Sequence, residues 1–153
     1  MREAQNIPRP VITVASVVVR DGAFLLVEEE TLRGPRLNQP AGHLESGETL
    51  IEAAVRETME ETGCRIVPTA LVGIYRWQSP DAAATYVRFA FAGDFVAHDP
   101  DRALDEGILR ALWLDYADLA ALRPMHRSPL VLRCVDDYRA GLRHPLDLVT
   151  EIS

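Results

Sequence analysis

The sequence predicts an α+β fold in which a mixed β-sheet is flanked by helices. Strand-like segments lie on both sides of one helix whose two ends carry capping residues, and two further helical segments follow toward the C-terminus. Strands and helices do not alternate regularly, which argues against a doubly wound parallel sheet. The length of 153 residues and the 48% hydrophobic content suffice for one core. We therefore expect a single domain over residues 1–153.

A β-hairpin is expected at the start of this fold. Residues 11–19 are rich in β-branched side chains, an Asp-Gly pair at residues 21–22 favours a tight turn, and residues 24–27 resume the apolar run. Residues 28–39 contain a glycine, a proline and three consecutive glutamates. We expect an exposed loop there, leading to a short strand that ends at Pro40.

The central helix carries a signal at each end. Thr49 has a glutamate three residues later, which is the spacing of a capping box, and Gly63 supplies the C-terminal stop. At 100° per residue, Glu57, Glu60 and Glu61 share one arc of the helix. The arc expected to face the core contains Ile51, Ala54, Val55, Thr58, Met59 and Thr62. The sequence therefore predicts a helix of roughly thirteen residues with a core face and a carboxylate face.

Two long strands and one short strand are expected after this helix. Residues 64–77 and 85–96 are rich in strand-forming side chains, and a Ser-Pro-Asp turn at residues 79–81 joins them. Residues 110–114 predict the short strand.

Two helices are expected near the C-terminus. Residues 115–122 form the first, and residues 128–139 form the second, with Ser128 as its N-cap and Pro129 at its first helical position. These helices complete the set that flanks the sheet.

The charge distribution restricts the classes of partner. The formal net charge is −7, and every Lys or Arg is an arginine, because the sequence contains no lysine. These arginines are spread along the chain, so nonspecific binding to nucleic acid or to an anionic membrane surface is not expected. The lack of lysine also excludes a Walker-type phosphate lysine and a Schiff-base mechanism. A small anionic substrate fits this balance if a bound cation offsets the charge.

The cysteines and the N-terminal residues indicate a soluble protein of a reducing compartment. Cys64 and Cys134 lie far apart without a CxxC spacing, so neither a zinc knuckle nor a disulfide framework is expected. Residues 1–10 are polar and contain two prolines, unlike a signal peptide, and the apolar stretch at residues 11–19 is too short to span a bilayer. We therefore expect a cytoplasmic protein that is a monomer or a small homo-oligomer.

The three glutamates of the central helix need a compensating positive charge. Like charges three or four residues apart destabilise an isolated helix by about 0.2–0.5 kcal/mol per pair. A divalent cation would supply the opposite charge, and carboxylate oxygens select hard ions such as Mg²⁺, with Mn²⁺ as a substitute. On spacing alone, a solvated acidic face is more common than a metal site. The residues around the helix are therefore needed to distinguish the two.

Seven residues in and around the helix form one spaced motif. They are Gly42, Glu48, Arg56, Glu57, Glu60, Glu61 and Gly63. The pattern resembles the Nudix box, GX5EX7REUXEEXGU, at every fixed position. Its two apolar positions hold Thr58 and Cys64, and Thr58 departs from the usual aliphatic residue, which affects packing more than chemistry. The resemblance implies a Nudix-like α/β/α sandwich with a mixed central β-sheet.

The resemblance also implies roles for the motif residues. The implied metal ligands are Glu57, Glu60, Glu61 and the backbone carbonyl of Gly42. Arg56 would hold the helix glutamates and Glu48 in place, and a surface ion pair with Glu52, four residues earlier, is the alternative for Arg56.

The implied reaction is attack of a metal-activated water on phosphorus. Glu60 or Glu61 is the expected general base. Many relatives place a further carboxylate in the loop before the tryptophan-containing strand, here the strand of Trp113, and Glu106 or Asp105 fits that position. The expected catalytic set is Glu48, Arg56, Glu60, Glu61 and Glu106.

Segments outside the motif resemble the NudJ phosphatase branch of the family. They are residues 38–45, 77–81 and 127–130, so the resemblance covers most of residues 11 to 147. It implies release of phosphate from nucleoside triphosphates and diphosphates, or from the pyrimidine diphosphate precursor of thiamine. Leu37 departs from the pattern, because tryptophan is usual there and a leucine cannot stack on a heterocycle as an indole does.

Polar and aromatic residues at strand or helix ends are candidates for contacts with the substrate. They are Arg36, Asn38, Gln39, Arg76, Trp77, Arg88 and Ser128. A second hypothesis is a pyrophosphatase for nucleotide sugars, dinucleotides or capped RNA ends. A third is a non-catalytic Nudix domain that senses a nucleotide, and the intact motif glutamates argue against it.

Overall fold

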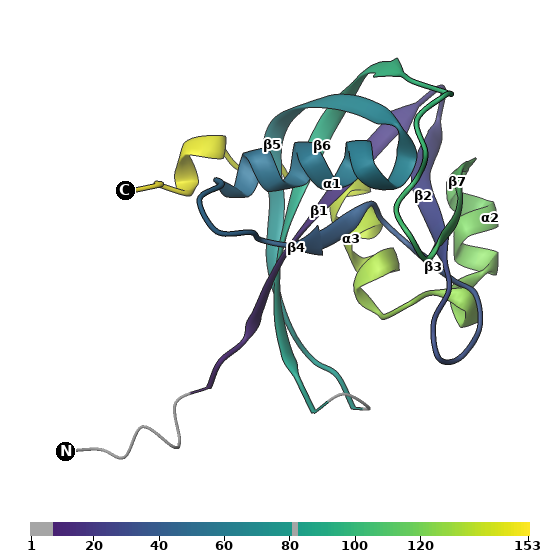
Figure 1. Cartoon of the computed structure of the whole chain (residues 1–153), viewed down its shortest axis with the longest axis horizontal. Helices are drawn as coiled ribbons and strands as arrows, with labels where there is room; N and C mark the ends of the chain where they lie inside the picture. The colour runs from purple at the N-terminus through teal and green to yellow at the C-terminus, as the bar shows by residue number, and fades with distance from the viewer. Residues whose placement is uncertain (1–7, 81–82) are drawn as a thin grey trace.

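The structure is a computed structural model that describes residues 8–80 and 83–153 (Figure 1). Its strands are β1 (Val11–Arg20), β2 (Ala23–Glu29), β3 (Arg36–Asn38), β4 (Ala41–His43), β5 (Cys64–Gln78), β6 (Thr85–His98) and β7 (Ile108–Leu114). Its helices are α1 (Leu50–Thr62), α2 (Tyr116–Ala121) and α3 (Leu130–Arg139), with short 3-10 turns η2 (Arg123–Met125) and η3 (Leu146–Leu148). No helix of this described part is long and apolar enough to cross a membrane.

The strands form one sheet of seven strands. The sheet is mixed, as the sequence predicts. β1 lies at its centre, parallel to β6 and antiparallel to β2 and β4. β5 pairs antiparallel with β6, and both β3 and β7 pair antiparallel with β2. The parallel pairing of β1 with β6 places Val11, the first residue of β1, beside the long hairpin of β5 and β6.

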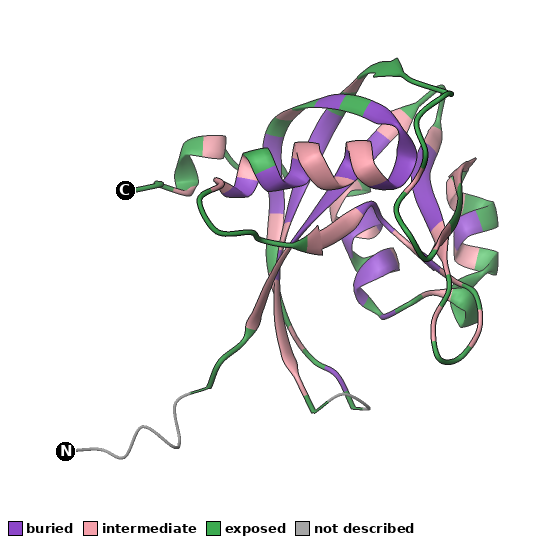
Figure 2. Ribbon diagram, in the orientation of Figure 1, coloured by how far each residue is buried: buried purple, intermediate pink, exposed green. Residues whose placement is uncertain are grey.

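Helices cover both faces of this sheet, because successive strand residues point to opposite sides. Phe91 of β6 is fully buried and packs with Leu50 of α1. Its neighbour Ala90 faces the other side, where it packs with Leu119 of α2 and Val131 of α3. Burying a side chain such as Phe91 contributes roughly 1.5–3 kcal/mol. Figure 2 shows buried residues along the central strands and on the inner sides of the helices, which confirms the α/β/α sandwich.

The helix α1 has the two ends that the sequence predicts. Thr49 Oγ1 accepts a hydrogen bond from the Glu52 N–H (3.1 Å), and Glu52 Oε1 accepts one from the Thr49 N–H (3.4 Å), so the capping box is formed. Such a cap contributes about 1 kcal/mol. Gly63 ends the helix with φ of 73°, a conformation that favours glycine. In addition, Glu151 accepts a hydrogen bond from the Leu50 N–H (2.9 Å), which ties the C-terminal segment to the start of α1.

The buried face of α1 differs from the predicted arc. Ala53 is fully buried, and Glu61 is only 7% exposed although the helical pattern places it on the carboxylate face. The reason is β4, which lies against this end of α1 and donates the Ala41 N–H to Glu61 Oε1 (2.8 Å). Thr58, the departure from the motif, is also fully buried. Its hydroxyl donates to a backbone carbonyl one turn earlier (2.8 Å) and is hydrogen-bonded to the Ser16 hydroxyl (2.9 Å), so this polar side chain is satisfied in the core.

The segment after the first hairpin is more ordered than the sequence predicts. β2 continues through Glu29, so the loop covers only residues 30–35, and two short strands replace the single strand expected to end at Pro40. Glu29 is half-buried and forms an ion pair with Arg127 (2.7 Å). The prediction of an exposed loop was therefore wrong at residues 28–29, because strand pairing with β7 and this long-range ion pair hold them.

The start of α3 also differs from the prediction. The helix begins at Leu130, so Pro129 occupies the N-cap position rather than the first helical position. The side chain of Ser128 still accepts a hydrogen bond from the Leu130 N–H (3.2 Å), which is the contact expected of a capping serine. Of the turn predicted at residues 79–81, Asp81 lies outside the described residues.

Candidate active site

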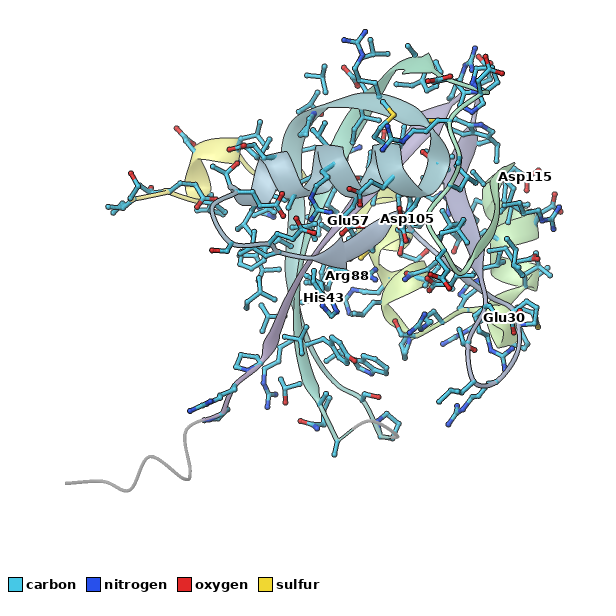
Figure 3. All side chains as sticks on the ribbon, viewed as in Figure 1. Glu30, His43, Glu57, Arg88, Asp105 and Asp115 are labelled. Atoms are coloured by element: carbon cyan, nitrogen blue, oxygen red, sulfur yellow. The ribbon has the colours of Figure 1, made fainter. Side chains whose placement is uncertain are left out.

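Three carboxylates meet where α1 approaches the loop before β7 (Figure 3). Glu57 and Glu60 of α1 and Asp105 of the loop each offer one oxygen, and these oxygens all lie within 4.8 Å of one another. The two glutamates are neighbours on the helix surface because they are three residues apart. The loop is fixed at this place, since Asp105 donates its backbone N–H to the carbonyl of Glu60 (3.0 Å). We call these three residues the acidic cluster.

Gly42 lets Glu57 approach β4 closely. A Cβ atom built on Gly42 would overlap the carboxyl group of Glu57, so a side chain at this position would displace that carboxyl group. β4 is held in register against β1, where Gly42 is opposite Val14. The backbone of β4, including the carbonyl expected to bind metal, therefore borders the acidic cluster.

Arg56 ties the acidic residues of the motif together. Its Nε and Nη2 donate to the two oxygens of Glu48 (2.9 and 2.7 Å), and its Nη1 donates to Glu57 (2.9 Å) and Glu60 (3.0 Å). The hydrogen bonds from Arg56 lower the pKa of Glu48, so this carboxylate stays ionised. Glu52 instead caps the helix, and no ion pair between it and Arg56 occurs in the described chain. Arg56 is therefore placed to orient the acidic side chains.

Glu61 stands apart from the acidic cluster. It is buried, and burial raises its pKa to about 8. The hydrogen bond from the Ala41 N–H acts in the opposite direction, and the carboxylates of Glu29, Glu57 and Asp105 raise the pKa further. Glu61 is therefore not a member of the acidic cluster, but it lies near enough to Glu57 and Asp105 for their charges to act on it. A cation bound at the acidic cluster would favour the ionised form of Glu61.

The donor set fits Mg²⁺ or Mn²⁺. The side chains of the acidic cluster offer only carboxylate oxygens, which hard divalent cations prefer to the nitrogen and sulfur ligands of zinc. Burial raises the pKa of Glu57, and the charges of Glu60 and Asp105 act in the same direction, although Arg56 opposes them. A divalent cation would offset the negative charge that Arg56 leaves uncompensated.

Of the two loop acids considered from the sequence, the structure brings Asp105 to the helix. Glu106 is exposed and is not one of the described residues that form the acidic cluster. Both residues precede the strand of Trp113, and the pattern of a loop does not distinguish adjacent positions. The backbone hydrogen bond to Glu60 is what selects Asp105.

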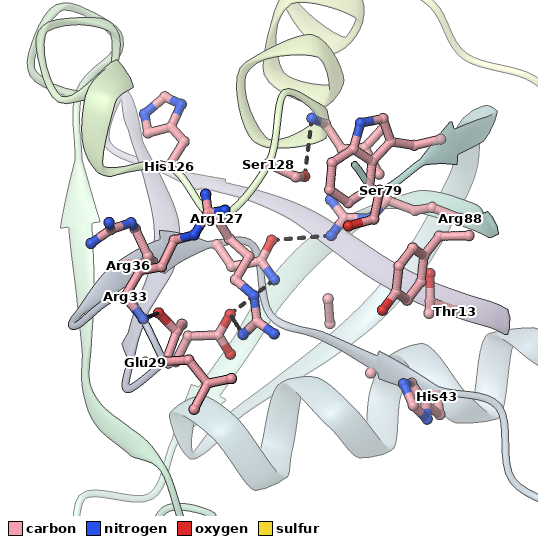
Figure 4. A pocket seen from close by; sticks show the side chains of 18 of the residues that line it. Thr13, Glu29, Arg33, Arg36, His43, Ser79, Arg88, His126, Arg127 and Ser128 are labelled. Carbon is pink, nitrogen blue, oxygen red and sulfur yellow. Dashed lines mark hydrogen bonds and ion pairs between the residues drawn. The ribbon is translucent and has the colours of Figure 1, made fainter. Parts of the chain in front are cut away.

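A pocket of about 550 Å³ borders β4, the strand that also borders the acidic cluster (Figure 4). All three residues of β4 line it. Arg33, Arg36 and Arg127 lie on one side of the pocket, and Arg88 and Thr13 lie on the other. Four arginines thus line one pocket in a protein whose net charge is −7. Pockets of this size admit small organic ligands, and the charge favours an anionic one.

An aromatic pair lines the same pocket. Trp77 of β5 and Tyr86 of β6 are register partners, and their rings stack with a centroid distance of 5.9 Å and an interplanar angle of 25°. Leu37, where the family usually has tryptophan, is buried at 4% exposure. The aromatic surface of the pocket therefore comes from β5 and β6 rather than from position 37.

The residues predicted to contact the substrate lie in three places: in the wall of the pocket, beneath it and outside it. The pocket is lined by Arg36, Asn38, Trp77, Arg88 and Ser128. Gln39 is buried beneath these residues, where its Oε1 accepts a hydrogen bond from Arg88 (2.9 Å) and its Nε2 donates to the Val131 carbonyl (2.6 Å). Arg76 is exposed and does not line the pocket, because alternate residues of β5 point to opposite faces.

Sequence reasoning missed several residues that line the pocket. They are Thr13, Glu29, Arg33, Tyr86 and Arg127. Most come from separate strands and loops, and no local pattern links them. Tyr86 is the exception, because the antiparallel pairing of the two predicted long strands places it opposite Trp77.

Comparisons with known proteins show to which family the chain belongs. The family model of the NUDIX domain matches residues 9–133. Phosphatase NudJ of Escherichia coli strain K12 is 39% identical over 146 residues, which cover 95% of this chain and 94% of that protein. The solved structure of a NUDIX hydrolase from Nitrosomonas europaea is 49% identical, has a TM-score of 0.91, and is matched over 98% of its length by 94% of this chain.

A more distant structure shares the fold alone. The NUDIX domain of Shewanella oneidensis NrtR, solved in complex with ADP ribose, is 17% identical with a TM-score of 0.72, over 92% of this chain and 94% of that one. The family match covers most of the chain, and the relatives of higher identity are hydrolases or phosphatases by name. This chain therefore belongs to the Nudix family and is a hydrolase.

Proposed function

We propose that this hydrolase cleaves a phosphoanhydride bond in nucleoside triphosphates and diphosphates, or in the pyrimidine diphosphate precursor of thiamine, with Mg²⁺ as its metal and Mn²⁺ as a substitute. The observation that carries the proposal is the position of the acidic cluster beside a pocket lined by arginines and an aromatic pair. The acidic cluster suits a metal-bound diphosphate, and the aromatic pair suits the flat ring of the substrate. The similarity to phosphatase NudJ supports the release of phosphate.

The acidic cluster would hold the metal, with help from the Gly42 carbonyl. When bound, the metal neutralises charge on the phosphate oxygens and lowers the pKa of a water molecule. Arg56 acts as a positioning residue, because it fixes the orientation of Glu57 and Glu60 without occupying all their oxygens. Glu48 in turn fixes Arg56 through its bidentate contact.

A general base has to take the proton of the attacking water, and we propose Glu60 or Glu61. Glu60 is partly exposed, with 28% of its side-chain surface accessible, so water reaches it directly. Glu61 is held in one orientation by the Ala41 N–H, which suits a base that must lie within hydrogen-bonding distance of the nucleophile. On the pocket wall, Arg36 and Arg127 are placed to bind phosphate oxygens.

A pyrophosphatase that acts on nucleotide sugars, dinucleotides or capped RNA ends is the second candidate. The three arginines on the wall opposite Arg88 favour it, because they would contact a second phosphorylated group. Product analysis separates the two functions. Orthophosphate supports the phosphatase, whereas a nucleoside monophosphate together with a second phosphorylated product supports the pyrophosphatase. A nucleotide sensor without activity would release neither.

The test is a screen of phosphate-containing metabolites with Mg²⁺, followed by identification of the product and repeated with two variants. Glu60→Gln and Glu61→Gln remove charge at nearly constant shape, and each is expected to reduce turnover by on the order of a thousandfold. Circular dichroism should show an unchanged fold. Glu30→Gln is the matched control, because Glu30 is exposed and outside the acidic cluster. Wild-type turnover in both glutamate variants would contradict the assigned chemistry.

A further inference from the structure

Arg88 is a buried cation whose hydrogen-bond partners are all uncharged. It is only 5% exposed. Its Nη1 donates to Gln39 Oε1 (2.9 Å) and contacts Cys134 Sγ (3.9 Å), and its Nη2 donates to Asn38 Oδ1 (3.0 Å). The Nε–H is also buried and has no hydrogen-bond partner among the residues described. Burying a cation without a carboxylate opposes folding, so stability does not account for this charge.

The two amide side chains around Arg88 are themselves held in place. Gln39 donates its Nε2 to the carbonyl of Val131 (2.6 Å), and Asn38 donates its Nδ2 to Glu29 Oε1 (3.3 Å). Figure 4 shows the contacts that lead from Arg88 toward Glu29 and Arg127. The guanidinium group is therefore fixed by neutral acceptors while its charge remains available to a ligand in the pocket.

Arg88 and the aromatic pair share one face of the sheet. Arg88 follows Tyr86 by two residues in β6, so their side chains point to the same side, as does Trp77 opposite Tyr86. Across the sheet, Arg88 is opposite Thr13 of β1, and Thr13 is opposite His43 of β4. A continuous row thus runs from the aromatic pair past the guanidinium group to the strand that borders the acidic cluster.

We propose that Arg88 and the Trp77–Tyr86 pair form a base-reading subsite that selects keto-bearing bases, guanine and uracil, over adenine. This inference rests on the proposed function, which accounts for the diphosphate end of the substrate. A flat ring stacks on aromatic side chains, whereas the groups suited to phosphate lie on the opposite wall and at the acidic cluster. The subsite therefore receives the base.

The keto preference follows from the donors of Arg88. A guanidinium group only donates hydrogen bonds, and the keto oxygen of guanine or uracil accepts them. Adenine presents an amino group where guanine has its keto oxygen, so two donors would face each other. The pyrimidine of the thiamine precursor also carries an amino group and no keto oxygen. Keto-bearing nucleoside diphosphates are therefore the better substrates.

The first experiment compares kcat/KM for guanosine, uridine and adenosine diphosphates in the wild type, Arg88→Met and Arg88→Lys. The wild type should prefer the two keto-bearing substrates by roughly tenfold or more. Arg88→Met should bring that preference close to one, and Arg88→Lys should retain part of it because the ammonium group still donates hydrogen bonds from one nitrogen atom. Arg76→Gln, on the opposite face of the adjacent strand, should keep the wild-type ratio. An equal loss on all three substrates in both Arg88 variants would overturn the subsite.

The second experiment measures binding without hydrolysis, so it also covers an Arg88 variant that does not fold. Guanosine, uridine and adenosine monophosphates are titrated into the wild-type protein without metal, with tryptophan fluorescence as the signal because Trp77 lines the pocket. Weaker binding of the adenosine compound supports the subsite, and equal binding of all three overturns it. Selective binding together with no hydrolysis of any diphosphate would overturn the proposed function alone. Hydrolysis without discrimination among bases would overturn the subsite alone.

Discussion

Arg56 and Arg88 both belong to the candidate active site, and each makes several hydrogen bonds. Arg56 is partly exposed and contacts the carboxylates of Glu48, Glu57 and Glu60, so its charge is balanced within the protein. Arg88 is buried and contacts two amide oxygens and a thiol, so its charge is not balanced. The charges that surround an arginine, more than its number of contacts, therefore separate the positioning role proposed for Arg56 from the ligand-binding role proposed for Arg88.

The strongest loss of activity is expected from a substitution in the acidic cluster. Asp105→Asn should reduce kcat/KM by roughly a hundredfold, because it removes one charged oxygen ligand from the acidic cluster. Glu106→Gln is the matched test of the adjacent acid and should keep the wild-type value. Steady-state kinetics at several Mg²⁺ concentrations measure both, and Asp105→Asn should also require more Mg²⁺. If Glu106→Gln loses activity and Asp105→Asn does not, the loop acid is Glu106, as the sequence alone favours.

An intermediate effect concerns the charge of Arg56. Arg56→Gln should lower the free energy of unfolding without metal by about 1–3 kcal/mol, because Glu48, Glu57 and Glu60 lose their shared cation. Mg²⁺ should then raise the melting temperature more in this variant than in the wild type, since the metal supplies the missing positive charge.

Arg88→Gln serves as the comparison, because Arg88 has no carboxylate partner among the described residues. Its response to Mg²⁺ should equal that of the wild type in the same thermal melts, with and without a chelator. A smaller Mg²⁺ response in Arg56→Gln than in the wild type would show that the two arginines do not differ in the way described.

The smallest effect concerns an arginine at the surface. Arg133 forms an ion pair with Asp137 (3.0 Å), four residues later in α3, and its side chain is 67% exposed. A pair with an exposed arginine contributes little, because water screens the charge of the guanidinium group. Arg133→Gln should therefore leave the melting temperature unchanged within error, both with and without Mg²⁺. A loss as large as that of Arg56→Gln would mean that any arginine pair stabilises this fold equally.

Much of the fold was predictable because its signals are local. The capping box at Thr49 and the stop at Gly63 set both ends of α1, and the runs of β-branched residues set the long strands. The predictions that were wrong concern residues whose conformation or burial depends on contacts distant in the sequence. Glu29 is held in a strand by pairing with β7 and by Arg127, and Glu61 is buried because β4 supplies its hydrogen-bond donor.

The candidate site divides in the same way. The acidic residues of α1 were predictable, since one helix presents them at fixed spacing. The pocket was only partly predictable, because residues such as Thr13 and Arg127 are brought together by strand pairing across the sheet and by the start of α3. The choice between Asp105 and Glu106 depends on one backbone hydrogen bond that no sequence pattern encodes.

Residues 38–43 restrict how the sequence of this enzyme can change, because they contact both Arg88 and the residues of α1. Asn38 and Gln39 orient Arg88, while Ala41, Gly42 and the carbonyl of His43 contact the glutamates and arginine of α1. Because side chains alternate between the faces of a strand, inserting or deleting one residue here would turn both sets of contacts away at once. On the proposed base-reading subsite, new substrate preferences would arise by exchanging side chains on the hairpin of β5 and β6, whereas insertions or deletions within residues 38–43 would disrupt both sets of contacts.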